Sequence, residues 1–371
     1  MATKKKLLQA AAGGAGGASL DITDVFSTYL YSGDATTRNI VNGVDLSGEG
    51  GLVWIKTRNA ANGHFLFDTE RGVQKYLQSN TTGAEGTLSN ALSAFNSDGF
   101  QVMIGINNTG DDQASWTFRK APKFFDVQTW TGDSTSNRAI PHNLDGAVGS
   151  YFVKCTSDST SSAWLVWHKD LSSNEHDLVL NTTELQANYN LFSTTAPDSS
   201  NVYLGTNYKD FYNATGRTYV AYLFAHNDGD GEFGPDGDQD IIKCGSFAHA
   251  YAGTEVNLGF EPQWILFKAA DQAGNNWFIF DAMRGIVTGG LSGDGDAALF
   301  PNTSGAENVN TWGVDLTATG FIVYGNNIAS SGNIIYMAIR RGPLAPPEAG
   351  TEAFAIDTQV NQDPPLFDSG F

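Results

Sequence analysis

The 371-residue chain is too long for one average domain, and its formal net charge is −19, with 21 basic against 40 acidic residues. Such a surface repels nucleic-acid phosphates, which argues against a DNA- or RNA-binding protein. The 42 glycines, the aromatic content of 12% and the lack of helical periodicity predict many short strands joined by tight turns.

The N-terminal sequence MATKKKLLQAAAGGAGGAS is rich in lysine, alanine and glycine. Its apolar stretch, Leu7–Ala12, is too short for a secretory signal, and no apolar run in the chain approaches the roughly 20 residues that cross a membrane. We therefore expect an extended attachment segment that contacts other proteins through residues 1–20. Its candidate attachment residues are Lys4, Lys5, Lys6, Leu7 and Leu8.

The sequence then repeats itself with a period of about 100 residues. In the first and last units, a β-rich stretch ends at Lys56 or Lys268, and a second one ends 12 or 13 residues later at Asp68 or Asp281. A middle unit keeps the β-rich stretches, among them Tyr151–Lys154, but is more diverged. Several short strands in each unit, separated by turn sequence, are typical of a β-sandwich.

We therefore predict an all-β fold of tandem antiparallel β-sandwich domains, jelly-roll or lectin-like, with an extended segment at each end. In one alternative, the first and last units pair their sheets into one larger body. The C-terminal stretch is rich in proline and predicts an extended arm. The predicted boundaries are 1–22 for the attachment segment, 23–125, 126–240 and 241–342 for the three sandwiches, with an acidic linker at 228–240, and 343–371 for the arm.

The first and last units share the motif Asp-x-x-Arg-Gly, which the middle unit lacks. The motif has two interpretations: a ligand site, or an Asp–Arg pair that fixes a turn in which glycine takes a positive φ. We favour the turn, because the motif recurs together with fold-defining residues. Its members are Asp68, Arg71 and Gly72, and Asp281, Arg284 and Gly285.

An acidic, glycine-rich loop is the best metal candidate. Carboxylate oxygens on a flexible loop suit Ca²⁺, but the spacing does not match an EF-hand. A solvated linker is the favoured alternative, so calcium is a candidate ligand and no cofactor is expected to be required. The carboxylates are Asp228, Asp230, Glu232, Asp236, Asp238 and Asp240.

Aromatic residues of the middle unit are candidates for contact with a host-surface glycan, because sugars stack on such rings. Core or inter-subunit packing is the favoured alternative for them. The candidates are Trp164, Trp167, Tyr208, Phe211 and Tyr212. Cys155 and Cys244, the two cysteines, are expected to be free and buried. No nucleophile elbow and no histidine pair at metal-binding spacing is present, so we predict no enzymatic activity.

Several blocks of the chain resemble a family of large virion proteins from marine bacteriophages. The junction WTFRKAPKFFDV at Trp116–Val127 is the most specific of them. The others are Asp24–Tyr31, Gly48–Lys56, Ala94–Phe100, Phe233–Asp240 and Ile242–Ser246. The resemblance implies concanavalin-like or laminin-G-like sandwiches in tail-fibre or structural proteins that have no proven activity.

The resemblance leads to the hypothesis of a non-enzymatic virion protein of the phage tail, a tail fibre or tail-associated protein that docks by its N-terminus. A capsid-decorating or head-fibre protein is the alternative, and a polysaccharide-degrading tail enzyme is less favoured. We expect a homo-oligomer, with a trimer as the first choice because phage appendages are usually symmetric.

Overall fold

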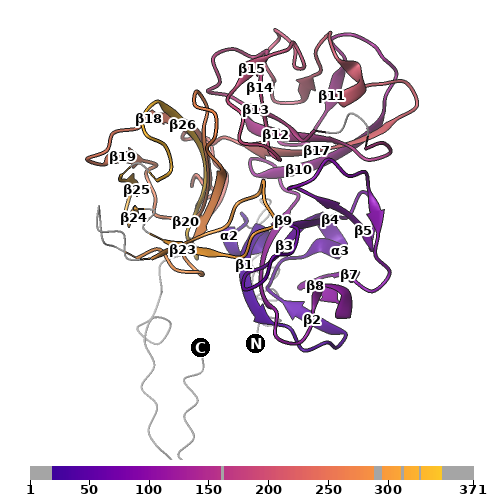
Figure 1. Cartoon of the computed structure of the whole chain (residues 1–371), viewed down its shortest axis with the longest axis vertical. Helices are drawn as coiled ribbons and strands as arrows, with labels where there is room; N and C mark the ends of the chain where they lie inside the picture. The colour runs from indigo at the N-terminus through magenta and orange to yellow at the C-terminus, as the bar shows by residue number, and fades with distance from the viewer. Residues whose placement is uncertain (1–18, 160–162, 288–294, 311–312, 326, 345–371) are drawn as a thin grey trace, which may run out of the picture.

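The computed structural model describes residues 19–159, 163–287, 295–310, 313–325 and 327–344. The described chain is nearly all β, which confirms the predicted fold class of antiparallel β-sandwiches. Three lobes surround a common centre (Figure 1). We call them unit 1 (strands β1–β9), unit 2 (β10–β17) and unit 3 (β18–β26). The predicted N-terminal segment up to residue 18, and the predicted arm from residue 345, lie outside the described residues.

Unit 1 contains a six-stranded sheet with the order β1-β9-β3-β4-β5-β6 and a smaller sheet with the order β2-β8-β7. The short helices α2 (Ile22–Val25) and α3 (Leu46–Glu49) precede β1 and β3, and the 3-10 turn η1 (Ile104–Ile106) follows β8. The strands are β1 (Phe26–Ser32), β2 (Arg38–Val41), β3 (Gly51–Thr57), β4 (Phe65–Asp68), β5 (Lys75–Gln78), β6 (Gly86–Thr87), β7 (Leu92–Asn96), β8 (Gly99–Val102) and β9 (Asp112–Arg119).

Unit 2 has the same strand order in its large sheet, β10-β17-β12-β13-β14-β15, and a two-stranded sheet β11-β16. The 3-10 turn η2 (Lys209–Phe211) precedes β17. The strands are β10 (Phe125–Thr131), β11 (Ala139–Pro141), β12 (Val148–Cys155), β13 (Leu165–His168), β14 (His176–Val179), β15 (Ala187–Asn188), β16 (Asn201–Tyr203) and β17 (Thr218–Ala225).

Unit 3 repeats the order once more in β18-β26-β20-β21, with a smaller sheet β19-β25-β24 and the pair β22-β23. A bridge between Ile279 and Leu299 places β22 beside β21. The strands are β18 (Ile242–Ala248), β19 (Thr254–Asn257), β20 (Pro262–Ala269), β21 (Trp277–Asp281), β22 (Asp296–Ala298), β23 (Asn308–Asn310), β24 (Val314–Thr317), β25 (Gly320–Val323) and β26 (Asn333–Arg340).

The central strands of the large sheets are buried on both faces. In β3, Val53 and Ile55 point into the interior of unit 1, whereas Leu52 and Trp54 belong to a second core that also holds residues of units 2 and 3. The same alternation occurs in β20, where Ile265 lies inside unit 3 and its neighbours face the shared core. Since side chains alternate along a strand, a strand that is apolar at every position is buried on both faces.

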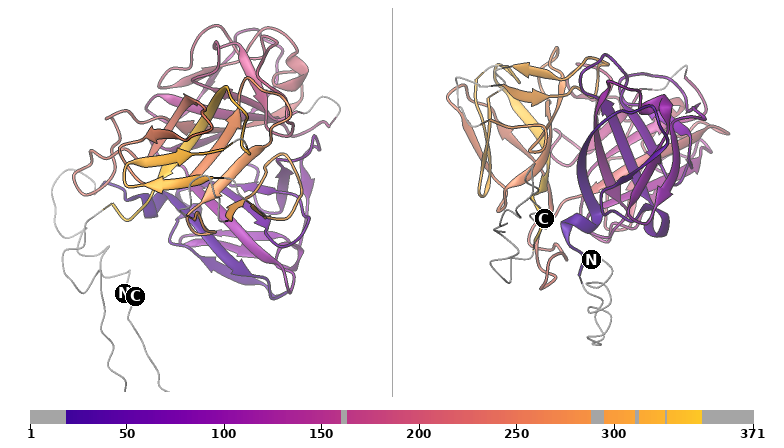
Figure 2. Two further views of the ribbon diagram at one scale, coloured as in Figure 1. Left: turned by 60° about the vertical axis from the view of Figure 1, so that its left-hand side comes forward. Right: turned by 90° about the horizontal axis from the view of Figure 1, so that it is seen from below.

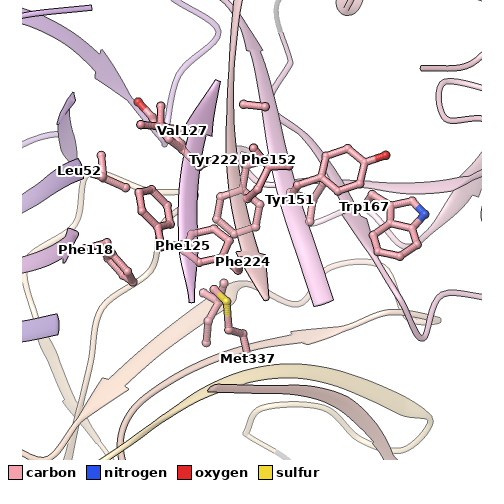
Figure 3. Close-up of a cluster of buried hydrophobic side chains, with 14 of the residues drawn as sticks. Leu52, Phe118, Phe125, Val127, Tyr151, Phe152, Trp167, Tyr222, Phe224 and Met337 are labelled. Carbon is pink, nitrogen blue, oxygen red and sulfur yellow. The ribbon is translucent and has the colours of Figure 1, made fainter. Parts of the chain in front are cut away.

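The three large sheets therefore pack face to face around one core. Phe118, Phe224 and Ile339 hold the same register position in β9, β17 and β26, opposite the first strand of each unit. The ring centroids of Phe118 and Phe224 are 5.6 Å apart, and Figure 3 shows the Phe224 side chain next to Met337 of unit 3. The right-hand view of Figure 2 shows units 1 and 3 side by side.

Candidate functional site

The contacts between units repeat with the same cyclic order. A backbone amide donates to a carbonyl just after the β3, β12 or β20 strand of the next unit. The amide lies seven residues beyond the end of β5 or β14, and nine beyond the end of β22. Because unit 3 returns to unit 1, the three units form a closed ring. The three hydrogen bonds are Glu85 N to Thr156 O at 2.8 Å, Gln186 N to Ala270 O at 2.7 Å and Glu307 N to Arg58 O at 2.6 Å.

A tryptophan or histidine side chain just before β4 and β13, or at the start of β21, makes a second repeated contact between units. Trp164 donates from Nε1 to Gln78 O of unit 1 at 2.9 Å, and Trp277 donates to Val179 O of unit 2 at 3.0 Å. His64 holds the same position in unit 1, and its ring interacts with the backbone of Phe300 in unit 3. All three side chains are buried at the junctions.

The repeated lysines also lie at the junctions. Lys154 donates to Thr82 O of unit 1 at 3.3 Å, and Lys268 lies 3.5 Å from Thr183 O of unit 2. Burial lowers the pKa of Lys56, Lys154 and Lys268 to about 8 each. Backbone carbonyls of the same and neighbouring units solvate these ammonium groups in place of water.

The Asp-x-x-Arg-Gly motif fixes a turn and joins two units. Asp68 accepts from Arg71 Nε at 2.6 Å, and the hydroxyl of Tyr222 from unit 2 donates to Asp68 Oδ2 at 2.8 Å. Gly72, at the end of the motif, has a φ of 91°. A Cβ added there would meet no atom, so the backbone conformation alone favours glycine.

The second copy of the motif closes the ring between units 3 and 1. Asp281 accepts from Arg284 Nε at 2.5 Å and from Trp116 Nε1 at 3.0 Å. The Arg284 guanidinium lies over the Trp116 ring, 5.5 Å from its centroid, and Gly285 has a φ of 106°. Trp116 holds the register position of Tyr222, so both copies of the motif use one arrangement.

The junction between units 2 and 3 uses histidine in place of the motif. His168 Nδ1 accepts from the Asp170 amide at 3.1 Å, so the neutral ring carries its proton on Nε2, 3.0 Å from Tyr336 O of unit 3. Burial lowers the pKa of His168 to about 4. This junction therefore depends on an uncharged imidazole.

The acidic loop fixes its own backbone. Asp240 accepts from the amides of Gly229 and Gly231, while Asp230 lies 3.3 Å from Lys123 Nζ. Among the residues that the structure describes, no group of three or more His, Cys, Asp or Glu side chains could hold a metal ion. The geometry therefore does not bring together Asp228, Asp230, Glu232, Asp236, Asp238 and Asp240.

The first described residues bond to this loop, and the last described residue bonds to Asp21 beside them. Ser19 donates from its hydroxyl to Gly234 O, and the Gly234 amide donates to Leu20 O at 2.9 Å. The Leu344 amide donates to Asp21 Oδ2 at 2.8 Å. The described chain thus enters and leaves the ring at one place. The predicted attachment residues Lys4, Lys5, Lys6, Leu7 and Leu8 lie outside the described residues.

The glycan candidates divide into buried and exposed residues. Trp164, Trp167 and Tyr212 are buried in the core, and Phe211 is half-buried against it. Tyr208 is 59% exposed and lines an open hollow together with Thr206, Asn207, Lys209 and Asp210. Burial excludes the first three from contact with a sugar, so the structure retains Tyr208 as the exposed candidate.

Tyr189, the neighbour of Tyr208, was not among the residues predicted from the sequence. Tyr189 is 54% exposed, and its ring stands edge-on to that of Tyr208 with centroids 6.0 Å apart. A comparison of units 1 and 2 contains the signal, because Ser89 holds the equivalent place in unit 1. Cys155 and Cys244 are free and buried, as predicted. Within the described part of the chain, no helix is both long and apolar enough to span a membrane.

Residues 21–343 match the family described as a domain of unknown function (DUF7483). The chain belongs to this family. The match runs from the residue before α2 to beyond β26, so one family domain covers all three units. No curated protein matches the chain.

Proposed function

We propose that this chain is a non-enzymatic structural protein of a phage particle, a tail fibre or tail-associated protein that displays a rigid ring of three β-sandwiches. The observation that carries the proposal is that the two ends of the described chain lie together: Leu344 bonds to Asp21, next to the residues that bond to Gly234. A ring whose described ends lie together has one natural anchoring side and keeps its other faces free for display.

The positions of the charged motif residues support a structural role. Asp68, Arg71, Asp281 and Arg284 are the conspicuous charged groups of the repeat, and all four serve the contacts within and between units. Their hydrogen-bonding capacity is used by the fold. A shared core and three polar junctions suit a protein that works outside a cell, where unfolding exposes the chain to proteases.

The composition and the sequence resemblance also support placement on a particle surface. A net charge of −19 keeps a crowded surface soluble and repels the packaged nucleic acid. The resemblance to marine phage virion proteins extends over nearly the whole chain. We propose docking through residues 1–20, and a symmetric homo-oligomer, first of all a trimer, on the particle.

Localisation tests the proposal. Antibodies against the purified chain should label the tails of particles of the phage that encodes it. Label on the capsid would favour a decorating or head-fibre protein instead, and the absence of label from every particle would refute the proposal. Deletion of residues 1–18 should abolish incorporation and leave the thermal unfolding of the ring unchanged. Light scattering on the full chain measures the copy number.

A further inference from the structure

We propose that Tyr189, Tyr208 and the polar loop at residues 206–210 form a binding site for a neutral saccharide on unit 2. The inference rests on the proposed display function and identifies the ligand class of the displayed surface. Figure 1 shows β11 and β15 of this unit at the rim of the molecule, away from α2.

The two tyrosine rings are presented in a fixed arrangement. Tyr208 has a φ of 49°, in the left-handed region that large residues seldom adopt. Its loop is held by the amides of Thr206 and Asn207, which donate to Asn190 O at 3.2 and 3.3 Å, and by the Tyr212 hydroxyl, 2.5 Å from Asn207 O. A fixed aromatic ring loses little conformational freedom when a ligand stacks on it.

Polar residues of several kinds surround Tyr208. Thr206, Asn207, Lys209 and Asp210 line the hollow with it, and the Lys209 ammonium also donates to Ser134 O. A sugar ring has apolar C–H faces that stack on aromatic rings, and hydroxyls that donate and accept hydrogen bonds. One cation and one anion leave the hollow without net charge, and a chain of charge −19 repels acidic glycans. Both points favour a neutral saccharide.

The site occurs in unit 2 and has no counterpart in unit 1. In both units a carbonyl, Asn90 O or Asn190 O, accepts a hydrogen bond from a backbone amide of the loop that follows β8 or β16. The loop then runs from Met103 to Asn107 in unit 1, but from Gly205 to Asn213 in unit 2, which is four residues longer. The longer loop anchors itself in the core through Phe211 and Tyr212 and holds Tyr208 in solvent.

Binding of the purified full chain to immobilised saccharides tests the proposal. The probes are neutral oligosaccharides of glucose, galactose, mannose and N-acetylglucosamine, with sialylated and sulfated glycans as the acidic set. We expect binding to at least one neutral probe. Tyr208→Ala and Tyr189→Ala should each weaken it at least about tenfold, and Tyr208→Phe should retain it because the ring face remains.

Tyr251→Ala is the matched control, since Tyr251 is also 59% exposed but lies on unit 3. It should bind as the unaltered chain does, and all variants should keep the same unfolding midpoint. Binding to no neutral probe, binding to acidic probes alone, or equal affinity of Tyr208→Ala and Tyr251→Ala would overturn the proposal. The assay uses no particles, so saccharide binding by a chain absent from virions would refute only the display function.

Discussion

The hydrogen bond between Tyr222 and Asp68 offers a direct test of the ring, because it joins residues 154 positions apart in two units. Tyr222→Phe removes one hydroxyl from a buried site and leaves the ring in place. The hydroxyl is bonded to Asp68 Oδ2 at 2.8 Å and lies 3.1 Å from Arg71 Nη2. A hydrogen bond to a charged group contributes about 1.5 to 3 kcal/mol, so the free energy of unfolding should fall by this amount.

A double-mutant cycle separates this contact from general damage. Asp68→Asn breaks the buried pair with Arg71 and should cost about 3 to 5 kcal/mol. Combined with Tyr222→Phe, it should show a coupling free energy of about 1.5 kcal/mol or more in urea unfolding. The control pairs Tyr222→Phe with Asp281→Asn at another junction, where we expect less than about 0.5 kcal/mol. Equal coupling in both cycles would refute the junction geometry.

Three further outcomes follow from the charged groups. Above its unfolded pKa of about 6.5, the buried neutral His168 contributes its full stabilisation. This stabilisation, about 3 kcal/mol, is lost as the pH falls towards 4. His168→Gln should flatten this part of a plot of the unfolding free energy against pH, and an unchanged plot would contradict the assignment. Burial raises the pKa of Asp177 to about 7, so its ionisation destabilises the fold increasingly from pH 4 to 7. Asp177→Asn should therefore stabilise the chain at pH 8, by up to about 4 kcal/mol, and have little effect at pH 4; the reverse order would be contrary to this reasoning. Millimolar CaCl₂ should not raise the unfolding midpoint, whereas a clear rise would show that the acidic loop rearranges around the ion.

Local features of the fold were predictable from the sequence. The stretches before Lys56 and Asp68 recur in the last unit at matching spacing, and these stretches are strands in the structure. The positive φ of Gly72 and Gly285 also follows from the motif, since both copies place glycine after the Asp–Arg pair. Such features depend on neighbours close in the chain, which a single sequence displays.

The ring was not predictable from the motifs, because each junction joins residues of different units. One signal was present, however. In the strand Gly51–Thr57, consecutive residues are apolar, so both faces of the strand are apolar. This is expected for a sheet that has no solvent-facing side. The sequence could not separate Trp164, Trp167 and Tyr212, which pack in the core, from the exposed Tyr208, because an aromatic residue near a strand does not indicate which face is covered.

The ring also changes how the family is understood. A single family domain spans three sandwiches with a shared core, so a unit cut from the chain would expose the apolar face of its large sheet. The stability, and with it the display function that we propose, therefore belongs to the whole ring, whereas the proposed tyrosine site belongs to unit 2 alone. Mutations at the two places should separate folding from binding.

Electron microscopy of particles from the encoding lineage, with antibodies raised against residues 19–344, tests the central claim most directly. The account predicts label on the tail, and density there that accommodates a ring of three β-sandwiches anchored on the side of Ser19 and Leu344. The claim would be contradicted if the particles carried no label although the same cultures contained abundant chain outside virions.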